Sequence, residues 1–185
     1  MKMNLRTMLF AAMFTALTAI GAFIKIPIPP YPVPMTLQTA FIFLAGLLLP
    51  VRAAFLSQAA YVLLGLIGIP IFTSGGGFSY VLNPTFGYLL AFLFCAPLTR
   101  YVAERTLYKG MRLRFALGGT AIILAVQICG VAYMAFISYV YLASPLPFSR
   151  ALYFILIFLP LDMFKLFLAS LLSIQLRKRV PGLFV

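Results

Sequence analysis

Histidine is absent from this chain of 185 residues, and only two residues, Glu104 and Asp162, are acidic. Such a sequence lacks the side chains for a Ser-His-Asp triad, a zinc site or a pair of catalytic carboxylates. The motifs G-x-S-x-G and G-x-x-x-x-G-K-S/T are also missing, which excludes a serine-hydrolase elbow and an ATP-binding P-loop. We therefore expect no catalytic residue, no metal and no cofactor, and any ATP hydrolysis must come from another chain.

Charge is scarce, at 9% of the residues, whereas 64% are hydrophobic and the mean hydropathy is +1.12. A soluble domain of this composition would aggregate, so we expect an integral membrane protein in a lipid bilayer. The net charge of +12 would suit nucleic acid. However, the basic residues alternate with apolar runs instead of forming one stripe, and we expect no nucleic-acid partner. Cys95 and Cys129 lie in apolar runs and are interpreted as packing residues.

Six apolar runs predict an all-α protein with six transmembrane helices in a single membrane domain, residues 1–185. The expected helices cover approximately residues 7–24, 35–49, 53–69, 84–101, 115–141 and 152–176. Because Lys2 and Arg6 precede the first run, a cleaved signal peptide is an alternative for that run alone. The run at 115–141 also has a polar residue, Gln127, near its middle.

Basic residues are distributed unequally between the two sides of the predicted helices. Alternating the helices places eleven on one side and two, Lys25 and Arg150, on the other. The eleven are Lys2, Arg6, Arg52, Arg100, Arg105, Lys109, Arg112, Arg114, Arg177, Lys178 and Arg179. The positive-inside rule then predicts that both termini are cytoplasmic. The proline-rich loop at 27–34 and the glycine-rich loop at 70–83 are expected outside.

The second run is short, because only fifteen residues precede Pro50. As a helix it would span about 22 Å, against roughly 30 Å for the membrane core. Thr36, Gln38 and Thr39 lie at its outer start, where polar groups must be buried in protein or face a cavity. Short, proline-interrupted helices are typical of transporter binding sites. The alternative for Gln38 is a hydrogen bond that only joins two helices.

Two features of the outer loops have local explanations. The glycine-rich stretch at 72–80 has no charge nearby, so it favours close approach to a neutral ligand, or simple turn chemistry, over a phosphate site. Asn83 followed by Pro84 predicts a helix start with Asn83 at the N-cap. Capping alone accounts for Asn83.

Asp162 and Lys165 lie near the middle of the last run, each roughly 18 Å from the nearer charged end. Residues three apart share a helical face. A charged side chain at this depth costs about 2.5 to 3.5 kcal/mol on insertion scales, so an accidental pair is improbable. We interpret the pair as the polar floor of a ligand cavity, in which Asp162 accepts and Lys165 donates hydrogen bonds. A structural ion pair is the alternative.

Ala12 and Ala16 form a small-x-x-x-small pair in the first helix. Such a pair allows the backbone of another helix to approach closely. The neighbour is either a partner protein or another helix of this chain.

Four stretches, in order and spacing, resemble the BioY family: 32–39 (PVPMTLQT), 65–72 (GLIGIPIF), 84–89 (PTFGYL) and 162–165 (DMFK). BioY proteins are the biotin-binding S components of energy-coupling factor (ECF) transporters, and the resemblance covers nearly the whole chain. It implies six membrane helices in the bacterial plasma membrane and capture of biotin from outside. It also implies association with a transmembrane T component and two ATP-binding-cassette ATPases.

The resemblance also implies roles for single residues. Asp162 and Lys165 correspond to the Asp-x-x-Lys that contacts biotin, and Gln38, Asn83 and Tyr88 are further candidates for substrate binding. Ala12 and Ala16 correspond to the strip that contacts the T component. The chain departs from the family pattern at Asn83 and Phe86, where glycine is frequent, which weakens the case for Asn83.

Three alternatives to biotin capture stay open. One is an S component for another small heterocyclic vitamin, and a second is a membrane scaffold subunit without a ligand. A membrane-embedded enzyme is the third, and the missing histidine disfavours it.

Overall fold

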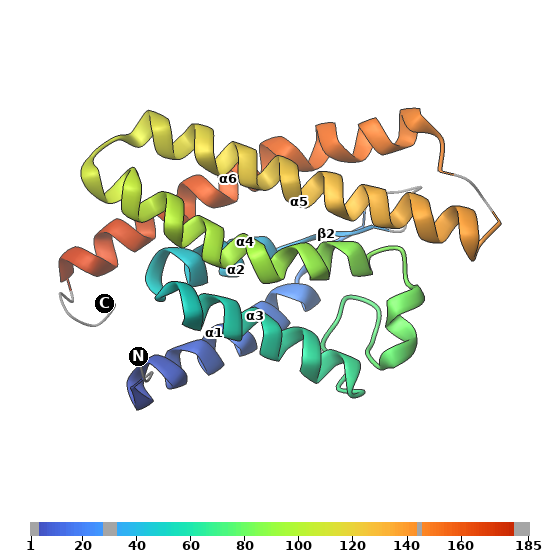
Figure 1. Ribbon diagram of the computed structural model, residues 1–185, viewed down its shortest axis with the longest axis horizontal. Coiled ribbons are helices and arrows are strands. Elements are labelled where there is room, and N and C mark those ends of the chain that lie inside the picture. The colour runs from blue at the N-terminus through green and yellow to red at the C-terminus, as the bar shows by residue number, and fades with distance from the viewer. Residues whose placement is uncertain (1–3, 28–32, 144–145, 180–185) are drawn as a thin grey trace.

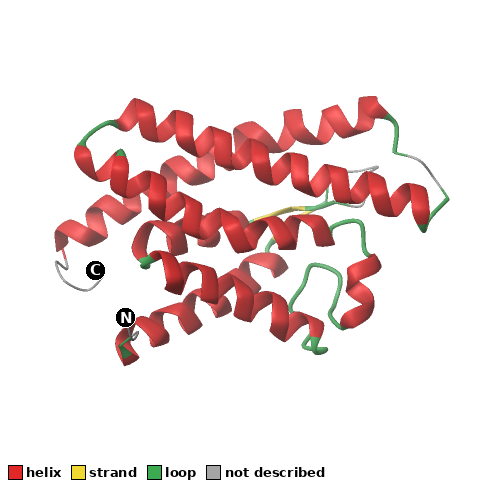
Figure 2. Cartoon of the chain, in the orientation of Figure 1, coloured by secondary structure: helices red, strands yellow, loops and turns green. Residues whose placement is uncertain are grey.

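A computed structural model describes residues 4–27, 33–143 and 146–179, and the chain is almost entirely helical (Figures 1 and 2). The helices are α1 (Leu5–Phe23), α2 (Gln38–Leu48), α3 (Val51–Leu66), α4 (Phe86–Arg105), α5 (Arg112–Val140) and α6 (Phe148–Arg179), with short 3-10 helices η1 (Phe78–Leu82) and η2 (Leu107–Lys109). Two-residue strands β1 (Lys25–Ile26) and β2 (Met35–Thr36) pair antiparallel. The predicted all-α class is confirmed. Lys2 and most of the proline-rich loop lie outside the described residues.

Four of the described helices, α1, α4, α5 and α6, are long and apolar enough to cross a membrane. Helices α2 and α3 are apolar but shorter, with 11 and 16 residues. The predicted start of the second helix at residue 35 is wrong, because Met35 and Thr36 pair with β1 instead. Leu49 has an extended backbone, as expected for the residue before Pro50, and α2 therefore ends at Leu48.

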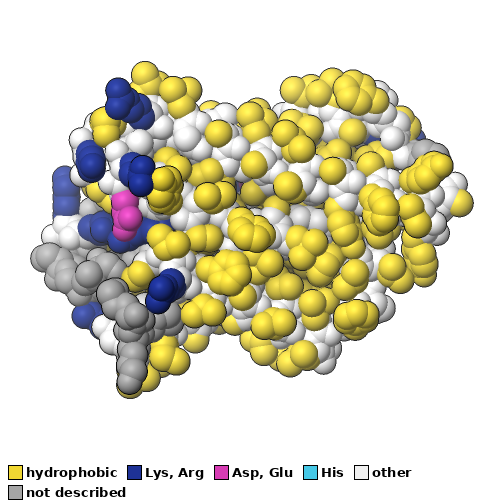
Figure 3. All heavy atoms as spheres, in the orientation of Figure 1, with side chains coloured by type: hydrophobic (Ala, Val, Ile, Leu, Met, Phe, Trp, Pro, Cys, Tyr) yellow, Lys and Arg dark blue, Asp and Glu magenta, His cyan; other side chains and the backbone are white. Residues whose placement is uncertain are grey.

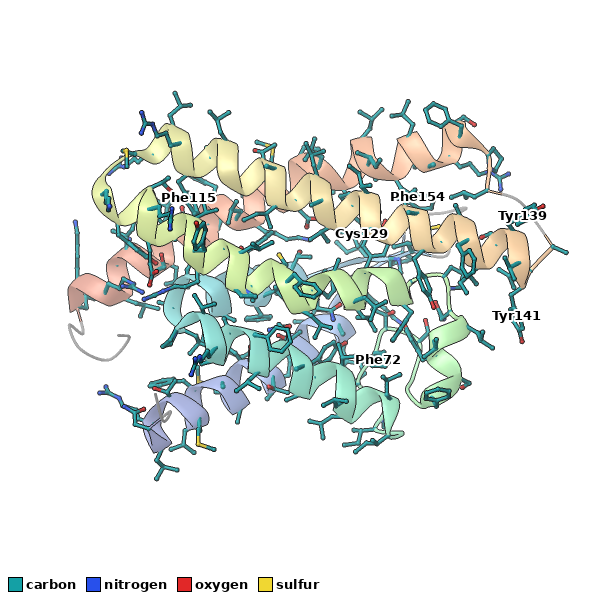
Figure 4. The ribbon with its side chains drawn as sticks, viewed as in Figure 1. Phe72, Phe115, Cys129, Tyr139, Tyr141 and Phe154 are labelled. Carbon is teal, nitrogen blue, oxygen red and sulfur yellow. The ribbon has the colours of Figure 1, made fainter. Side chains whose placement is uncertain are left out.

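The two ends of the helical body differ in composition. Lysine and arginine side chains gather at one end in Figure 3, and both termini lie at this end in Figure 1. We call it the charged end. Tyr139 near the end of α5 and Tyr141 just after it lie at the opposite end, where they are 72% and 60% exposed (Figure 4). Between the two ends the visible surface is mainly hydrophobic (Figure 3).

Helix α2 packs against α1, α4 and α6. Glycines permit the closest of these contacts. A β-carbon at Gly46 would lie 2.4 Å from the carbonyl oxygen of Ala96 on α4, and one at Gly21 of α1 would lie 2.8 Å from the Cα of Gln38. Small residues let helix backbones approach closely in this way. The packing thereby fixes the first residue of α2, Gln38, against the body of the protein.

At the charged end, one backbone carbonyl joins several elements. The oxygen of Leu47 on α2 accepts hydrogen bonds from Tyr108 Oη at 2.6 Å, Arg177 Nη2 at 3.0 Å and Arg100 Nη1 at 3.4 Å. The Arg177 guanidinium also lies 4.1 Å above the Tyr108 ring, and Arg100 Nε is 2.6 Å from Glu104. These contacts hold the end of α2 to α4, η2 and α6.

The backbone conformation and packing of the glycine-rich loop explain why glycine occurs there. Gly75 and Gly77 have φ angles of 115° and 103°, which side-chain-bearing residues rarely adopt. A β-carbon at Gly76 would lie 2.3 Å from the oxygen of Ile69, and the Gly77 amide donates to Gly65 at 2.7 Å. Turn chemistry, one of the two explanations offered by the sequence, is observed here together with close backbone packing.

Candidate ligand-binding site

A small, partly open cavity, with about 60 Å³ of space open to the centre of a water molecule, lies where α2 and α4 begin, on the side away from the charged end. Its walls come from four helices and from the proline-rich and glycine-rich loops. The lining residues are Val33, Pro34, Thr36, Gln38, Thr39, Thr73, Tyr80, Thr85, Tyr88, Leu89, Phe92, Val126, Gln127, Phe158, Asp162 and Lys165. The structure thus brings together four predicted substrate-binding residues: Gln38, Tyr88, Asp162 and Lys165.

Asp162 and Lys165 form an ion pair with a nitrogen–oxygen distance of 3.0 Å. Thr39 Oγ1 donates to the same Asp162 oxygen, Oδ1, at 2.8 Å. Lys165 Nζ also donates to Thr39 Oγ1 at 2.9 Å and to the Thr36 carbonyl at 2.8 Å. All three ammonium N–H groups therefore have partners in this structure, and a ligand contact from Lys165 would replace one of them.

Gln127 on α5 completes this polar group. Its Nε2 donates to Asp162 Oδ2 at 2.9 Å, so both carboxylate oxygens are engaged. Sequence reasoning did not select Gln127 as a site residue. The available signal was the one that selected Asp162: a polar side chain near the middle of an apolar run, which must find a partner in protein.

Three buried polar atoms on the cavity wall have no hydrogen-bond partner among the described residues. They are Gln38 Nε2, Tyr88 Oη and Gln127 Oε1. Buried polar groups are almost always paired, and leaving one unpaired costs about 1 to 3 kcal/mol. A ligand that supplies acceptors to Gln38 and Tyr88 and a donor to Gln127 would remove this cost. Tyr61 of α3 lies within side-chain hydrogen-bonding reach of Gln38, so the alternative role of Gln38 in joining two helices stays open.

The rest of the wall is apolar. Leu89 and Phe92 contribute from α4, Val126 from α5 and Phe158 from α6. An apolar wall with a few converging polar groups is the usual form of a small-molecule site. The arrangement suits a ligand with a hydrogen-bonding ring and an apolar remainder.

Asn83 does not line the cavity. Its Oδ1 accepts from the Thr85 amide at 3.0 Å and from Thr85 Oγ1 at 2.8 Å, and α4 begins just after this turn, at Phe86. Asn83 thus makes the capping hydrogen bond that the sequence predicted, and its own backbone is extended, whereas Thr85 has helical angles and makes no capping hydrogen bond. Asn83 orients Thr85, which does line the cavity.

One exposed side chain joins β1 to the glycine-rich loop. Lys25 Nζ of β1 donates to the Thr73 carbonyl of the glycine-rich loop at 2.6 Å. Thr73 Oγ1 is in turn 2.9 Å from Tyr80 Oη, which lies 3.0 Å from Thr85 Oγ1. The glycine-rich loop is thus connected to the start of α4.

Asp162 is the single acidic side chain among the residues that line the cavity. Within the described ranges, no group of three or more His, Cys, Asp or Glu residues is placed to hold a metal ion. Cys95 is buried as predicted for a packing residue, whereas Cys129 is exposed on α5, so the packing interpretation is wrong for Cys129. The cavity offers acceptors and donors around a single acid.

Comparison with known proteins points to one family. The BioY family model matches residues 1–182. A biotin transporter BioY from Thermotoga maritima is 33% identical over 175 residues, which cover 94% of this chain and 97% of that protein. A crystal structure of the S-component for biotin from an ECF-type ABC transporter matches with a TM-score of 0.78 and 30% identity, covering 96% of this chain and 95% of that one.

Two further relatives match over shorter stretches. A probable biotin transporter BioY from Lysinibacillus sphaericus is 54% identical over 99 residues, which span 54% of this chain and 50% of that protein. A probable biotin transporter BioY from Pyrococcus horikoshii is 42% identical over 102 residues, or 59% of its length. The chain therefore spans only about half the length of these two relatives.

Proposed function

Because the chain belongs to the BioY family, we propose that it binds biotin and serves as the substrate-capture subunit of an ECF-type transporter. The observation that carries the proposal is a cluster of hydrogen-bonded polar side chains at one side of an apolar-walled cavity. The cluster consists of Thr39, Gln127, Asp162 and Lys165. Biotin has matching parts, since its ureido ring offers two N–H donors and a carbonyl, while its thioether ring and chain are apolar. The relatives of this chain carry biotin in their names, which supports biotin as the ligand of this chain as well.

In this proposal each polar group has a partner on biotin. Asp162 accepts from the ureido ring, and Lys165 donates to the ureido carbonyl or to the carboxylate tail after releasing one of its present acceptors. Gln38 Nε2 and Tyr88 Oη donate to the remaining acceptors of the ligand. Asn83 acts indirectly, by holding Thr85.

We further propose that the protein is a single membrane domain of the bacterial plasma membrane, with its charged end in the cytoplasm. The basic side chains at that end support this orientation through the positive-inside rule. The exposed Tyr139 and Tyr141 at the other end suit the opposite membrane interface. The cavity then opens toward the outside, where biotin is captured.

A transmembrane T component and separate ATPases complete the proposed transporter. Ala12 and Ala16 are exposed on α1, whereas the neighbouring Ala11 and Thr15 are buried and Thr15 Oγ1 donates to Ser57 of α3 at 2.8 Å. The alanine pair is thus available to a partner helix. We propose that it contacts the T component.

Isothermal titration of the purified protein tests the proposed function. We expect saturable binding of one biotin, with no competition from a tenfold excess of thiamine or riboflavin. Displacement by another heterocyclic vitamin would reassign the ligand. Absence of any binding would favour the scaffold alternative and end the proposal.

A further inference from the structure

Gln127 is held in one orientation by its neighbour. An ionised carboxylate only accepts hydrogen bonds, so the Gln127 atom facing Asp162 Oδ2 at 2.9 Å must be the amide nitrogen. The amide oxygen then points away from Asp162. This oxygen is buried without a donor among the described residues, although Gln127 is only 2% exposed and lines the cavity.

We infer that Gln127 contacts the ligand directly, with Oε1 accepting one N–H of the bound heterocycle. The inference rests on the proposed biotin site and identifies a donor on the ligand that α5 recognises. The two N–H groups of a cyclic urea diverge, so a single acceptor atom cannot serve both. Asp162 already accepts from Thr39, Lys165 and Gln127, and the Gln127 oxygen adds an acceptor that is still unused.

This geometry makes Gln127 a determinant of specificity. A ligand with oxygen in place of that N–H would leave Oε1 unpaired and would set it against another acceptor. Sites that pair a buried polar group with a ligand N–H reject analogues that lack it, because the protein group then stays unsatisfied. The cavity should therefore discriminate between the urea of biotin and a cyclic carbamate of the same shape.

Gln127→Met tests the inference, because it keeps the length of the side chain and removes both polar atoms. Titrations would use biotin and the two carbamate analogues in which one ring N–H or the other is replaced by oxygen. We expect the variant to bind biotin about tenfold more weakly. With the carbamate that lacks the recognised N–H, the variant and the unaltered protein should bind alike.

Gln58→Met is the matched control. Gln58 is another buried glutamine with an unpartnered Oε1, its Nε2 lies 3.1 Å from Ser57 Oγ, and it does not line the cavity. Biotin affinity should be unchanged in this variant. If Gln127→Met is not recovered folded, Gln127→Asn withdraws the amide by one methylene and should give the same pattern.

The outcomes separate a ligand contact from support of Asp162. Equal weakening of biotin and both carbamates would indicate that Gln127 only positions Asp162, and would overturn the inference. Unchanged biotin affinity of both Gln127 variants would overturn it as well, while leaving the proposed function intact. Failure of the unaltered protein to bind biotin would instead overturn the proposed function and the inference together.

Discussion

Gly130 of α5 lies directly against the ring of Tyr88 on α4, and a β-carbon at position 130 would be 2.4 Å from Tyr88 Cε1. The ring forms part of the cavity wall, with its hydroxyl unpaired. The absence of a side chain at position 130 therefore leaves the space that the ring occupies. A larger residue there would displace the ring of this cavity-lining tyrosine.

Gly130→Ala should weaken biotin binding about tenfold or more. Overpacking by one methyl group typically costs about 1 to 3 kcal/mol, and each 1.4 kcal/mol changes affinity tenfold. Isothermal titration measures the change. The matched control is Gly118→Ala on the same helix, whose β-carbon would meet Val102 at 2.7 Å, away from the cavity. Equal losses in the two variants would contradict a role specific to Tyr88.

Asp162→Asn and Lys165→Met should each weaken biotin binding by roughly ten- to a hundredfold, because a hydrogen bond to a charged group contributes about 1.5 to 3 kcal/mol. Asp162→Leu combined with Lys165→Leu distinguishes a ligand site from a structural brace. A buried ion pair that only braces helices is often replaced by apolar residues without loss. A double variant that is stable in detergent and binds biotin like the parent would remove both residues from the site.

Membrane orientation can be checked by labelling intact cells with an impermeant maleimide. Ser74→Cys in the glycine-rich loop should be modified, and Lys109→Cys in η2 should be protected until the cells are opened. Both positions are exposed in the structure. A background with Cys95→Ser and Cys129→Ser removes the native thiols. The reverse labelling pattern would place the charged end outside the cell.

Ala12→Trp combined with Ala16→Trp should separate the protein from its T component in a pull-down and leave biotin binding intact, since bulky rings prevent close helix approach. Ala121→Trp with Ala125→Trp is the matched control, because these alanines are also exposed and four residues apart, on α5. Only the α1 pair should disrupt the complex. Disruption by both pairs, or by neither, would refute a contact specific to α1.

The sequence predicted the parts of this fold that depend on hydropathy. The all-helical class and the short second helix follow from apolar run lengths and proline positions. The start of α2 could not be predicted, because Met35 and Thr36 pair with β1 across the proline-rich loop, which is a contact between two segments and not a property of either one. Local propensity does not contain such information.

The sequence selected cavity-lining residues where a residue was costly to bury, and it missed one whose position depends on the folded chain. Asp162 and Lys165 were identified because charge inside a membrane needs a partner. Asn83 was assigned to the cavity, yet its side chain turns back to Thr85. Gln127 was noted as polar but not selected, since only the folded chain brings it within 2.9 Å of Asp162.

Helix α2 is fastened to α6 at both of its ends, by Thr39 to Asp162 at one and by Leu47 to Arg177 at the other. A tilt of α2 against α6 would break bonds at both ends at once. We therefore expect the two helices to move as one unit, which preserves the spacing between the cavity residues that they carry.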